Sequence, residues 1–487
     1  MFGDYVLEKT AAQYTKKILL VDADDLEEKA HYSAAFKAHD FRIITFTDDL
    51  NFRIHDAGAL NDDEKTAVLV NPSTYVPYDI QKKCRIERIS FDTLFPKLNS
   101  TVLREKDSLD VDLLTLAYRT DFGEYHERVQ TERFLQLKMY ALQNVETYVK
   151  ALYKHALDQA NHIKDYATWF EIAEEKAKID VIATEHHVDI DTSELNHIFC
   201  TYVLQHFGKL SSEISSESPV LVSGVMDYIH ENSEKAVIIV MDGMSEFDWA
   251  VLKRSFCGIH YSQSAAFAMI PSTTSISRQC LLSGKYPVQL LEPWKQSEEK
   301  TEFYHSAGNY GYKDSQIGYG RGYETDFGPA VKCGAVIIND VDDMVHGQLQ
   351  GRQGMFNDMN VLANQHKLVE TVQRLLSKGF DVYISADHGN TPCTGMGKLM
   401  KTGVETQTKS RRMIVLKDFA DEDSLLAKYP DLIEYPGYYL DKQYKYLICG
   451  AGDSFDAKGE EVMSHGGITM DEVIVPFIKI KAVDNNG

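Results

Sequence analysis

Carboxylates and imidazoles recur in the C-terminal half of the sequence, directly after short apolar runs. Asp242 ends one such run and precedes a glycine, and Asp387 and His388 end another before a further glycine. Because the carboxyl ends of parallel strands meet at one edge of a sheet, we expect these side chains to converge there. Oxygen and imidazole donors without thiolates suit Zn²⁺, our first choice, or Mn²⁺.

The same residue types occur in two further segments. Asp342 and His346 are four positions apart after an apolar run, and His465 precedes two glycines ahead of the last apolar run. Asp340 and Asp343 flank the first of these aspartates, and the spacing favours Asp342. Together with a threonine hydroxyl, these carboxylate and imidazole groups are more numerous than the ligands of one tetrahedral ion. They fit two ions about 3.5–4 Å apart, the arrangement of metal-assisted phosphoryl transfer.

A hydroxyl-rich segment between these motifs contains Thr273, Thr274 and Arg278. A Thr hydroxyl is unreactive at neutral pH, and coordination to a divalent cation activates it. Structural alternatives exist for single residues, since an Asp after a strand is often a cap and the Thr pair is typical of a helix N-terminus. Asp387 and His388 fit such roles less well, because burying two ionisable groups is costly without a metal or a partner.

These residues must be positioned by the elements of the C-terminal region. Alternating apolar runs and helical patterns over 220–487 predict an α/β fold with a mostly parallel sheet and helices on both faces. The predicted strands are 236–241, 335–338, 381–385, 413–417, 446–449 and 473–481.

Three stretches of the chain differ in pattern and predict three domains. Residues 1–122 alternate apolar runs with helical segments, and an acidic run after the first strand is typical of receiver domains. Asn71 stands where a receiver carries its phosphoacceptor aspartate, so we expect a receiver-like α/β domain without receiver chemistry. Residues 123–218 have helical periodicity and end in a Ser-rich linker, which predicts a helical connector. Residues 219–487 form the predicted catalytic domain.

Composition excludes several classes of protein. The chain has 487 residues and a net charge of −22, which opposes non-specific nucleic-acid binding. It contains no apolar run of about 18 residues, so we expect no membrane association, and its start does not resemble a secretory signal. Seven scattered cysteines without a Cys-x-x-Cys pair predict reduced thiols and a cytoplasmic location.

The motifs resemble the alkaline phosphatase superfamily, and within it the PglZ domain, over about residues 240–480. The resemblance rests on the order Asp-Gly, Thr…Gly, Asp-x-x-x-His, Asp-His-Gly and His-Gly-Gly. It implies an alkaline-phosphatase-like sheet in which Thr274 is the nucleophile, with Thr273 as the fallback, and in which Arg278 faces the phosphate or braces the turn. The implied ligands are Asp242, Thr274, Asp387 and His388 for one metal, and Asp342, His346 and His465 for the other.

The implied activity is hydrolysis of phosphate esters, with a phosphodiesterase favoured. The Cys/Ser-x-Pro-x-Arg signature of sulfatases is missing around Thr274, which argues against sulfate esters. No phosphate-binding Asn aligns after the nucleophile, so the preference for monoesters or diesters stays open. Two alternatives remain: a regulatory scaffold that keeps the metals but has little activity, and a phosphomutase. A nucleotide or an oligonucleotide would fit as substrate.

The N-terminal region has a looser resemblance to the leader of PglZ proteins from BREX-type phage-defence systems. It is carried by residues 18–22, 95–98 and 114–122. This resemblance implies a role in phage defence, with protein partners bound through residues 1–218.

Overall fold

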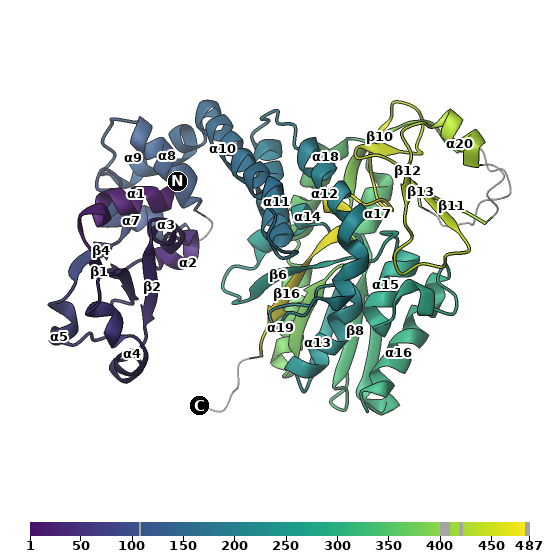
Figure 1. Cartoon of the computed structure of the whole chain (residues 1–487), viewed down its shortest axis with the longest axis horizontal. Helices are drawn as coiled ribbons and strands as arrows, with labels where there is room; N and C mark the ends of the chain where they lie inside the picture. The colour runs from purple at the N-terminus through teal and green to yellow at the C-terminus, as the bar shows by residue number, and fades with distance from the viewer. Residues whose placement is uncertain (107–108, 400–409, 418–421, 483–487) are drawn as a thin grey trace. The chain divides into compact units, whose positions relative to one another are not determined.

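The computed structural model describes residues 1–106, 109–399, 410–417 and 422–482. The chain divides into two compact units, Met1–Tyr148 and Val149–Gly487. In Figure 1 the first unit runs from purple to blue and the second from blue to yellow.

Unit 1 contains a four-stranded parallel sheet, as predicted for a small α/β domain. Its strands are β1 (Lys17–Asp22), β2 (Phe41–Phe46), β3 (Lys65–Val70) and β4 (Arg85–Ile89), in the order β2-β3-β1-β4. Receivers have the order 2-1-3-4-5, so the likeness to a receiver does not extend to the strand order. Apolar runs identify strands but do not specify their neighbours, which explains the difference.

Short capped helices complete unit 1. Both carboxylate oxygens of Asp22, at the end of β1, accept hydrogen bonds from the amides of Leu26 and Glu27, at 2.9 and 2.7 Å. This acidic residue therefore starts a helix. The helices are α1 (Phe2–Lys9), α2 (Leu26–Ala30), α3 (Ser33–Ala38), α4 (Asp49–His55), α5 (Tyr78–Gln81), α6 (Phe91–Leu94), α7 (Ser100–Arg104), α8 (Val111–Thr120) and α9 (Arg128–Phe134).

Unit 2 is built on a six-stranded sheet. The order is β6-β16-β9-β5-β8-β7; β5, β7, β8 and β9 are parallel, and β16 pairs antiparallel with β6 and β9. The strands are β5 (Ala236–Met241), β6 (Ser262–Phe267), β7 (Ile317–Arg321), β8 (Cys333–Ile338), β9 (Asp381–Ser385) and β16 (Ile474–Ile480). The predicted mostly parallel α/β sheet is confirmed.

Two predicted strands lie outside this sheet. The runs 413–417 and 446–449 correspond to β11 (Met413–Leu416) and β13 (Lys445–Ile448), which pair with each other and with β12 (Ile433–Tyr435) in a separate antiparallel sheet. Their place in the main sheet is taken by β6 and β7, whose sequences SQSAAF and IGYGR lack a continuous apolar run. A third small sheet joins β10 (Thr391–Gly395), β14 (Asp453–Ser454) and β15 (Glu461–Ser464).

Helices cover the main sheet of unit 2 (Figure 1). Trp169 and Phe199, on two helices of the predicted connector, belong to the same buried apolar cluster as β5 and β16. The helical stretch 123–218 thus contributes to both units, and the three-domain organisation stays a prediction. The helices are α10 (Leu142–Asn161), α11 (Thr168–Glu185), α12 (Ser193–His206), α13 (Val225–Asn232), α14 (Glu246–Leu252), α15 (Thr274–Ser283), α16 (Glu299–Asn309), α17 (Asp340–Gly347), α18 (Gly351–Asn364), α19 (Lys367–Ser377), α20 (Glu422–Lys428) and α21 (Met470–Val473).

None of the helices in the described part of the chain combines the length and the apolar character that a membrane span requires.

Candidate active site

The first candidate ligand lies where β5 ends. All six residues of β5 are buried, so the strand is fixed in the core up to the point where Asp242 leaves it. Gly243 then turns the chain with a φ of +74°, a conformation that side chains rarely adopt. A Cβ at Gly243 would meet Asp342 at 3.4 Å, so the turn packs directly against a second candidate ligand.

Asp387 and His388 follow β9 and are fully buried. One carboxylate oxygen of Asp387 accepts hydrogen bonds from the amides of Gly243, at 3.2 Å, and His388, at 3.1 Å. The other oxygen is buried and has no hydrogen-bond partner among the described residues. Burial, together with the nearby charge of Asp242, raises the pKa of Asp387 well above its usual range. A cation beside these two carboxylates would relieve both penalties.

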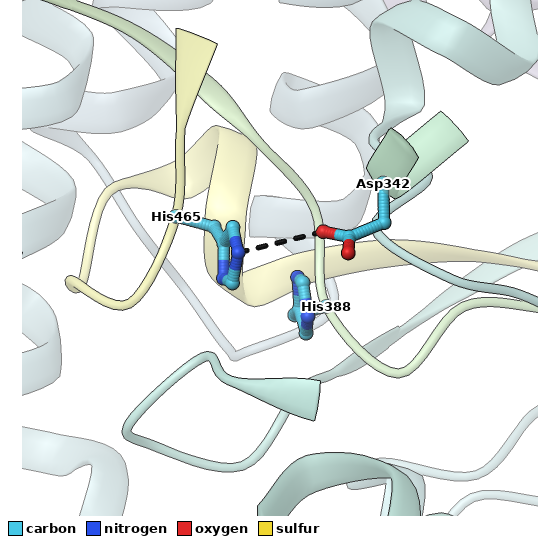
Figure 2. A group of neighbouring side chains, drawn as sticks. All are labelled: Asp342, His388 and His465. Atoms are coloured by element: carbon cyan, nitrogen blue, oxygen red, sulfur yellow. Dashed lines mark ion pairs between the residues drawn. The ribbon is translucent and has the colours of Figure 1, made fainter. Parts of the chain in front are cut away.

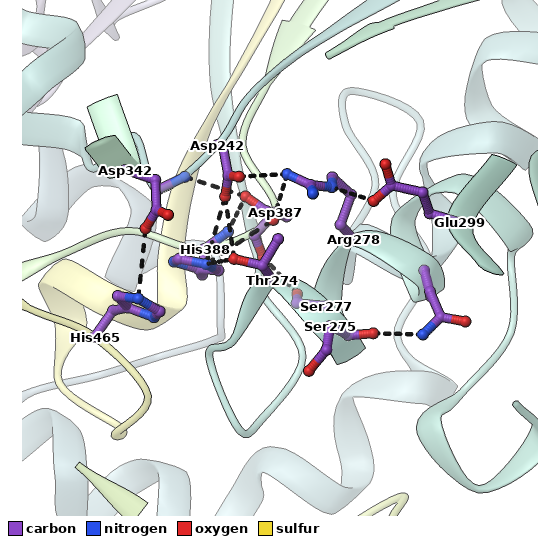
Figure 3. A network of polar contacts seen from close by, with 12 residues as sticks. Asp242, Thr274, Ser275, Ser277, Arg278, Glu299, Asp342, Asp387, His388 and His465 are labelled. Carbon is purple, nitrogen blue, oxygen red and sulfur yellow. Dashed lines mark hydrogen bonds and ion pairs between the residues drawn. The ribbon is translucent and has the colours of Figure 1, made fainter. Parts of the chain in front are cut away.

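Thr274 opens α15, and its hydroxyl faces these groups (Figure 3). Its Oγ1 lies 3.1 Å from Nε2 of His388 and 3.3 Å from Oδ1 of Asp242. Nδ1 of His388 lies 3.0 Å from the carbonyl oxygen of Gly389 and donates to it, so Nε2 is the ring nitrogen that faces the Thr274 hydroxyl. Thr273 occupies the N-cap position, but its side chain forms no capping bond with the described backbone. The capping interpretation of the Thr pair therefore does not describe this helix.

A second cluster lies beside the first. Asp342, His388 and His465 point toward one another in Figure 2, with Nε2 of His465 3.4 Å from Oδ1 of Asp342. The rings of His388 and His465 stack with their centroids 4.3 Å apart. His346 lies on the other side of the aspartate, with its Nε2 3.4 Å from Oδ2 of Asp342. These four residues lie close together. The predicted division, with His346 at this ion and His388 at the other, stays a prediction.

The protonation states of His465 and Asp342 are those that metal ligands require. Burial and the neighbouring His388 lower the pKa of His465 to about 4, so its ring is neutral at physiological pH. Nδ1 of His465 lies 3.0 Å from the Ser272 carbonyl oxygen, which fixes the proton there and leaves Nε2 free. Burial opposes ionisation of Asp342, but the hydrogen bond from His346 outweighs it, and the pKa of this carboxyl group is lowered.

Two groups of donors fit a metal ion. Their ligand atoms lie within 4.8 Å of one another, and the groups share His388. Oδ1 of Asp342 and Oδ2 of Asp387 are buried without a hydrogen-bond partner in the described chain, as expected of oxygens reserved for a cation. His346 belongs to neither group of three. The groups are Asp242, Asp387 and His388, and Asp342, His388 and His465.

Arg278 lies on the protein side of the site, away from the pocket. It is fully buried, and Figure 3 shows it directed at three carboxylates. Its Nη1 lies 2.5 Å from Oδ2 of Asp242 and 3.7 Å from Oδ2 of Asp387, and its Nε lies 2.7 Å from Oε2 of Glu299. Of the two roles considered for Arg278, this geometry favours bracing. Glu299, which also binds Tyr319 and Arg321, has no signal in the sequence that singles it out.

A pocket of about 280 Å³ opens beside Thr274. Trp294, Gln296 and Asn339 line it, and sequence reasoning found none of the three because they follow no motif. Oδ1 of Asn339 is buried without a hydrogen-bond partner among the described residues. The lining residues are Asp242, Thr273, Thr274, Ser275, Trp294, Gln296, Asn339, Asp342, His346 and His465.

The parallel sheet with acidic and imidazole side chains at its strand ends defines an alkaline-phosphatase-like domain. The family model of the BREX system PglZ alkaline phosphatase-like domain matches residues 221–480, just over half of the chain. The chain therefore belongs to the PglZ family, and the resemblance predicted from the sequence is confirmed.

Similar solved structures include human ectonucleotide pyrophosphatase/phosphodiesterase 5, with 13% identity and a TM-score of 0.37 over 50% of this chain and 87% of that chain. An inactive variant of the murine protein in complex with AMP has 11% identity and a TM-score of 0.36, over 51% and 88%. Phosphonoacetate hydrolase from Sinorhizobium meliloti 1021 in complex with phosphonoacetate has 11% identity and a TM-score of 0.32, over 52% and 92%. With TM-scores below 0.5, these likenesses carry no functional inference. Comparison with the curated proteins returns no match.

Proposed function

We propose that this protein is a metal-dependent phosphodiesterase that uses Thr274 as its nucleophile. The observation that carries the proposal is the position of the Thr274 hydroxyl, within 3.3 Å of Asp242 and His388. Both residues belong to the donor groups that fit a metal ion, and His388 belongs to both groups. A nucleophile in this position would lie next to both the bound cations and the substrate phosphorus.

Two divalent ions, Zn²⁺ first and Mn²⁺ second, fit the donors. Asp242, Asp387, His388 and Thr274 would hold one ion, and Asp342, His346 and His465 the other. Bound there, the ions would supply positive charge next to the nucleophile and the leaving oxygen. Arg278 and Glu299, a buried cation and a buried anion, cancel each other. Three carboxylates and two divalent ions then leave one net positive charge. That charge matches the single negative charge of a phosphodiester better than the two charges of a monoester.

The chain's own groups perform the steps of the proposed reaction. The Thr274 hydroxyl gives its proton toward Asp242 Oδ1, 3.3 Å away, because Nε2 of His388, a proposed metal ligand, would have no lone pair left for a proton. Its oxygen forms a bond to phosphorus while the bond from phosphorus to the leaving oxygen breaks, giving a phosphothreonine and an alcohol. The proton that left Thr274 passes to the departing alcohol. Water then attacks this phosphorus and the bond to Thr274 breaks, with one proton of the water going to the Thr274 oxygen and the hydroxide remaining on phosphorus.

Metal analysis and hydrolysis of chromogenic esters together test the proposal. We expect two metal ions per chain and faster cleavage of bis(p-nitrophenyl) phosphate than of p-nitrophenyl phosphate. Thr274→Ala should abolish turnover and keep both metals, whereas Asp387→Ala should also lose metal. Full activity in both variants would show that the residue roles are wrong. Two bound metals without hydrolysis of either ester would instead favour the regulatory scaffold.

We also propose that the activity serves phage defence, with residues 1–218 binding protein partners. The description of the family model, which names the BREX system, supports this role. A plaque assay tests it: a host that carries the intact system with Thr274→Ala should lose protection, and protection at the wild-type level would contradict a catalytic role in defence.

A further inference from the structure

An aromatic residue, Trp294, is among the residues that line the Thr274 pocket. The chain has three tryptophans. Trp169 and Trp249 are fully buried in the apolar core of unit 2, whereas Trp294 is partly exposed and lines the pocket. It lies just before η8 (Gln296–Glu298), a short 3-10 helix whose Gln296 side chain lines the same pocket. An indole ring at the wall of a ligand site offers a flat apolar surface on which a planar group can stack.

The loop that carries Trp294 is tied to the helix that carries Thr274. The buried side chain of Gln279, one turn into α15, places its amide nitrogen 2.6 Å from the carbonyl oxygen of Ser275 and 3.2 Å from that of Glu292. The first contact is within α15, and the second holds the loop two residues before Trp294. The position of the indole ring relative to the nucleophile is therefore set by one helix.

The rest of the lining indicates what kind of group stacks there. Within the described chain, the pocket lining includes no Lys or Arg, so the organic part of the ester is not recognised by a cationic side chain. Apart from the candidate ligands and the hydroxyl residues, the lining consists of Trp294 and the amides of Gln296 and Asn339. A flat apolar face together with amide donors and acceptors is the chemistry that recognises a nucleobase, through its π-face and its polar edge.

We propose that Trp294 is the stacking wall for a nucleobase, so that the substrates are phosphodiesters of nucleosides. The inference rests on the proposed function and narrows its substrate class. At about 280 Å³ the pocket is just below the usual range for small-ligand sites, which limits its occupant to a single nucleotide unit beside Thr274.

Two diesters with the same leaving group test the proposal on the full-length protein. They are thymidine 5′-(p-nitrophenyl phosphate) and ethyl p-nitrophenyl phosphate, which differ only in the group that remains on phosphorus. Wild-type protein should prefer the thymidine ester. Base stacking on an aromatic side chain corresponds to about 5- to 150-fold in affinity, so Trp294→Ala should lower kcat/KM for this ester by that factor. The ethyl ester should change by less than about twofold.

Two further variants serve as controls. Trp294→Phe keeps a flat ring and should retain most of the preference for the thymidine ester. Leu291 is on the same loop, is 87% exposed and is not part of the pocket lining. Leu291→Ala should therefore change neither ester. Equal loss on both esters in Trp294→Ala would show that the ring only supports the fold of the loop, and this would overturn the inference.

A binding experiment tests the stacking role of Trp294 independently of catalytic activity. By calorimetry, AMP should bind the wild-type protein about 5- to 150-fold more tightly than ribose 5-phosphate, and Trp294→Ala should remove this difference. Equal affinities in the wild type would overturn the inference. If neither chromogenic ester is hydrolysed, the proposed function fails, and the comparison of AMP with ribose 5-phosphate still tests Trp294 independently.

Discussion

Replacing Arg278 tests how the candidate site is held together. The guanidinium group is fully buried and lies among three carboxylates that are themselves almost fully buried. Arg278→Met keeps the length of the side chain and removes its charge. Asp242 and Asp387 then lose their closest cation, while Glu299 keeps Tyr319 and Arg321 as partners.

The expected cost follows from burial. Removing one partner of a buried ion pair destabilises a protein by about 3–5 kcal/mol, because a charge is left buried without compensation. At about 2 °C per kcal/mol for a large domain, the melting temperature of the metal-free variant should fall by about 6–10 °C. Divalent cations would neutralise the same two aspartates, so much of this loss should be recovered when metal is bound.

The assay is a calorimetric melt of wild type and Arg278→Met, each after chelation and again with excess Zn²⁺. Metal should raise the melting temperature of the variant more than that of the wild type. Arg278→Lys keeps the charge, but a lysine ammonium cannot contact Asp242 and Glu299 at once as the planar guanidinium does. The melting temperature of this variant after chelation should therefore lie between those of the wild type and Arg278→Met. An Arg278→Met variant that is as stable as the wild type after chelation, with a raised KM for diesters, would refute bracing and assign Arg278 to the substrate phosphate.

Two further predictions concern groups that no ion would touch. Burial and the nearby Glu174 raise the pKa of Glu246 to about 8, so the folded state keeps a proton that the unfolded state releases near pH 4.5. Stability should therefore fall as the pH rises from about 4.5 to about 8 and level off above that. Glu246→Gln should therefore raise the melting temperature at pH 8.5 more than at pH 5; an equal change at both values would contradict a protonated Glu246. A Cβ at Gly389 would lie 2.0 Å from the Asp471 carbonyl oxygen, whereas one at Gly308 meets nothing within 4 Å. Gly389→Ala should lower both melting temperature and metal content while Gly308→Ala leaves both unchanged, and a neutral Gly389→Ala would show that the loop after His388 is not tightly held.

Much of the sheet is predictable because its central strands are continuous apolar runs. β5, β8, β9 and β16 are almost entirely buried and were all expected. β6 and β7 have no such run, because Ser, Gln and Gly interrupt their sequences. Only their pairing with neighbouring strands in the folded sheet identifies them as strands. The pairing of β11 with β13 in a sheet of their own depends on tertiary contacts that periodicity does not report.

The candidate site is likewise only partly predictable from the sequence. Its ligands follow from the rule that polar residues at the carboxyl ends of parallel strands converge, and from the order of the motifs. The direction of Arg278 does not follow from the sequence, because a helix position one turn after Thr274 is compatible with either side of the site. Trp294 and Asn339 belong to no motif, and only the folded chain brings them into the pocket that Thr274 lines.

The central claim is that two cations bind next to Thr274. Anomalous diffraction from crystals grown with Zn²⁺ tests it most directly. We expect two peaks about 3.5–4 Å apart, one beside Asp242 and Asp387 and the other beside Asp342 and His465, with His388 near both. Peaks confined to other parts of the surface, or no peak within ligand distance of these side chains, would contradict it.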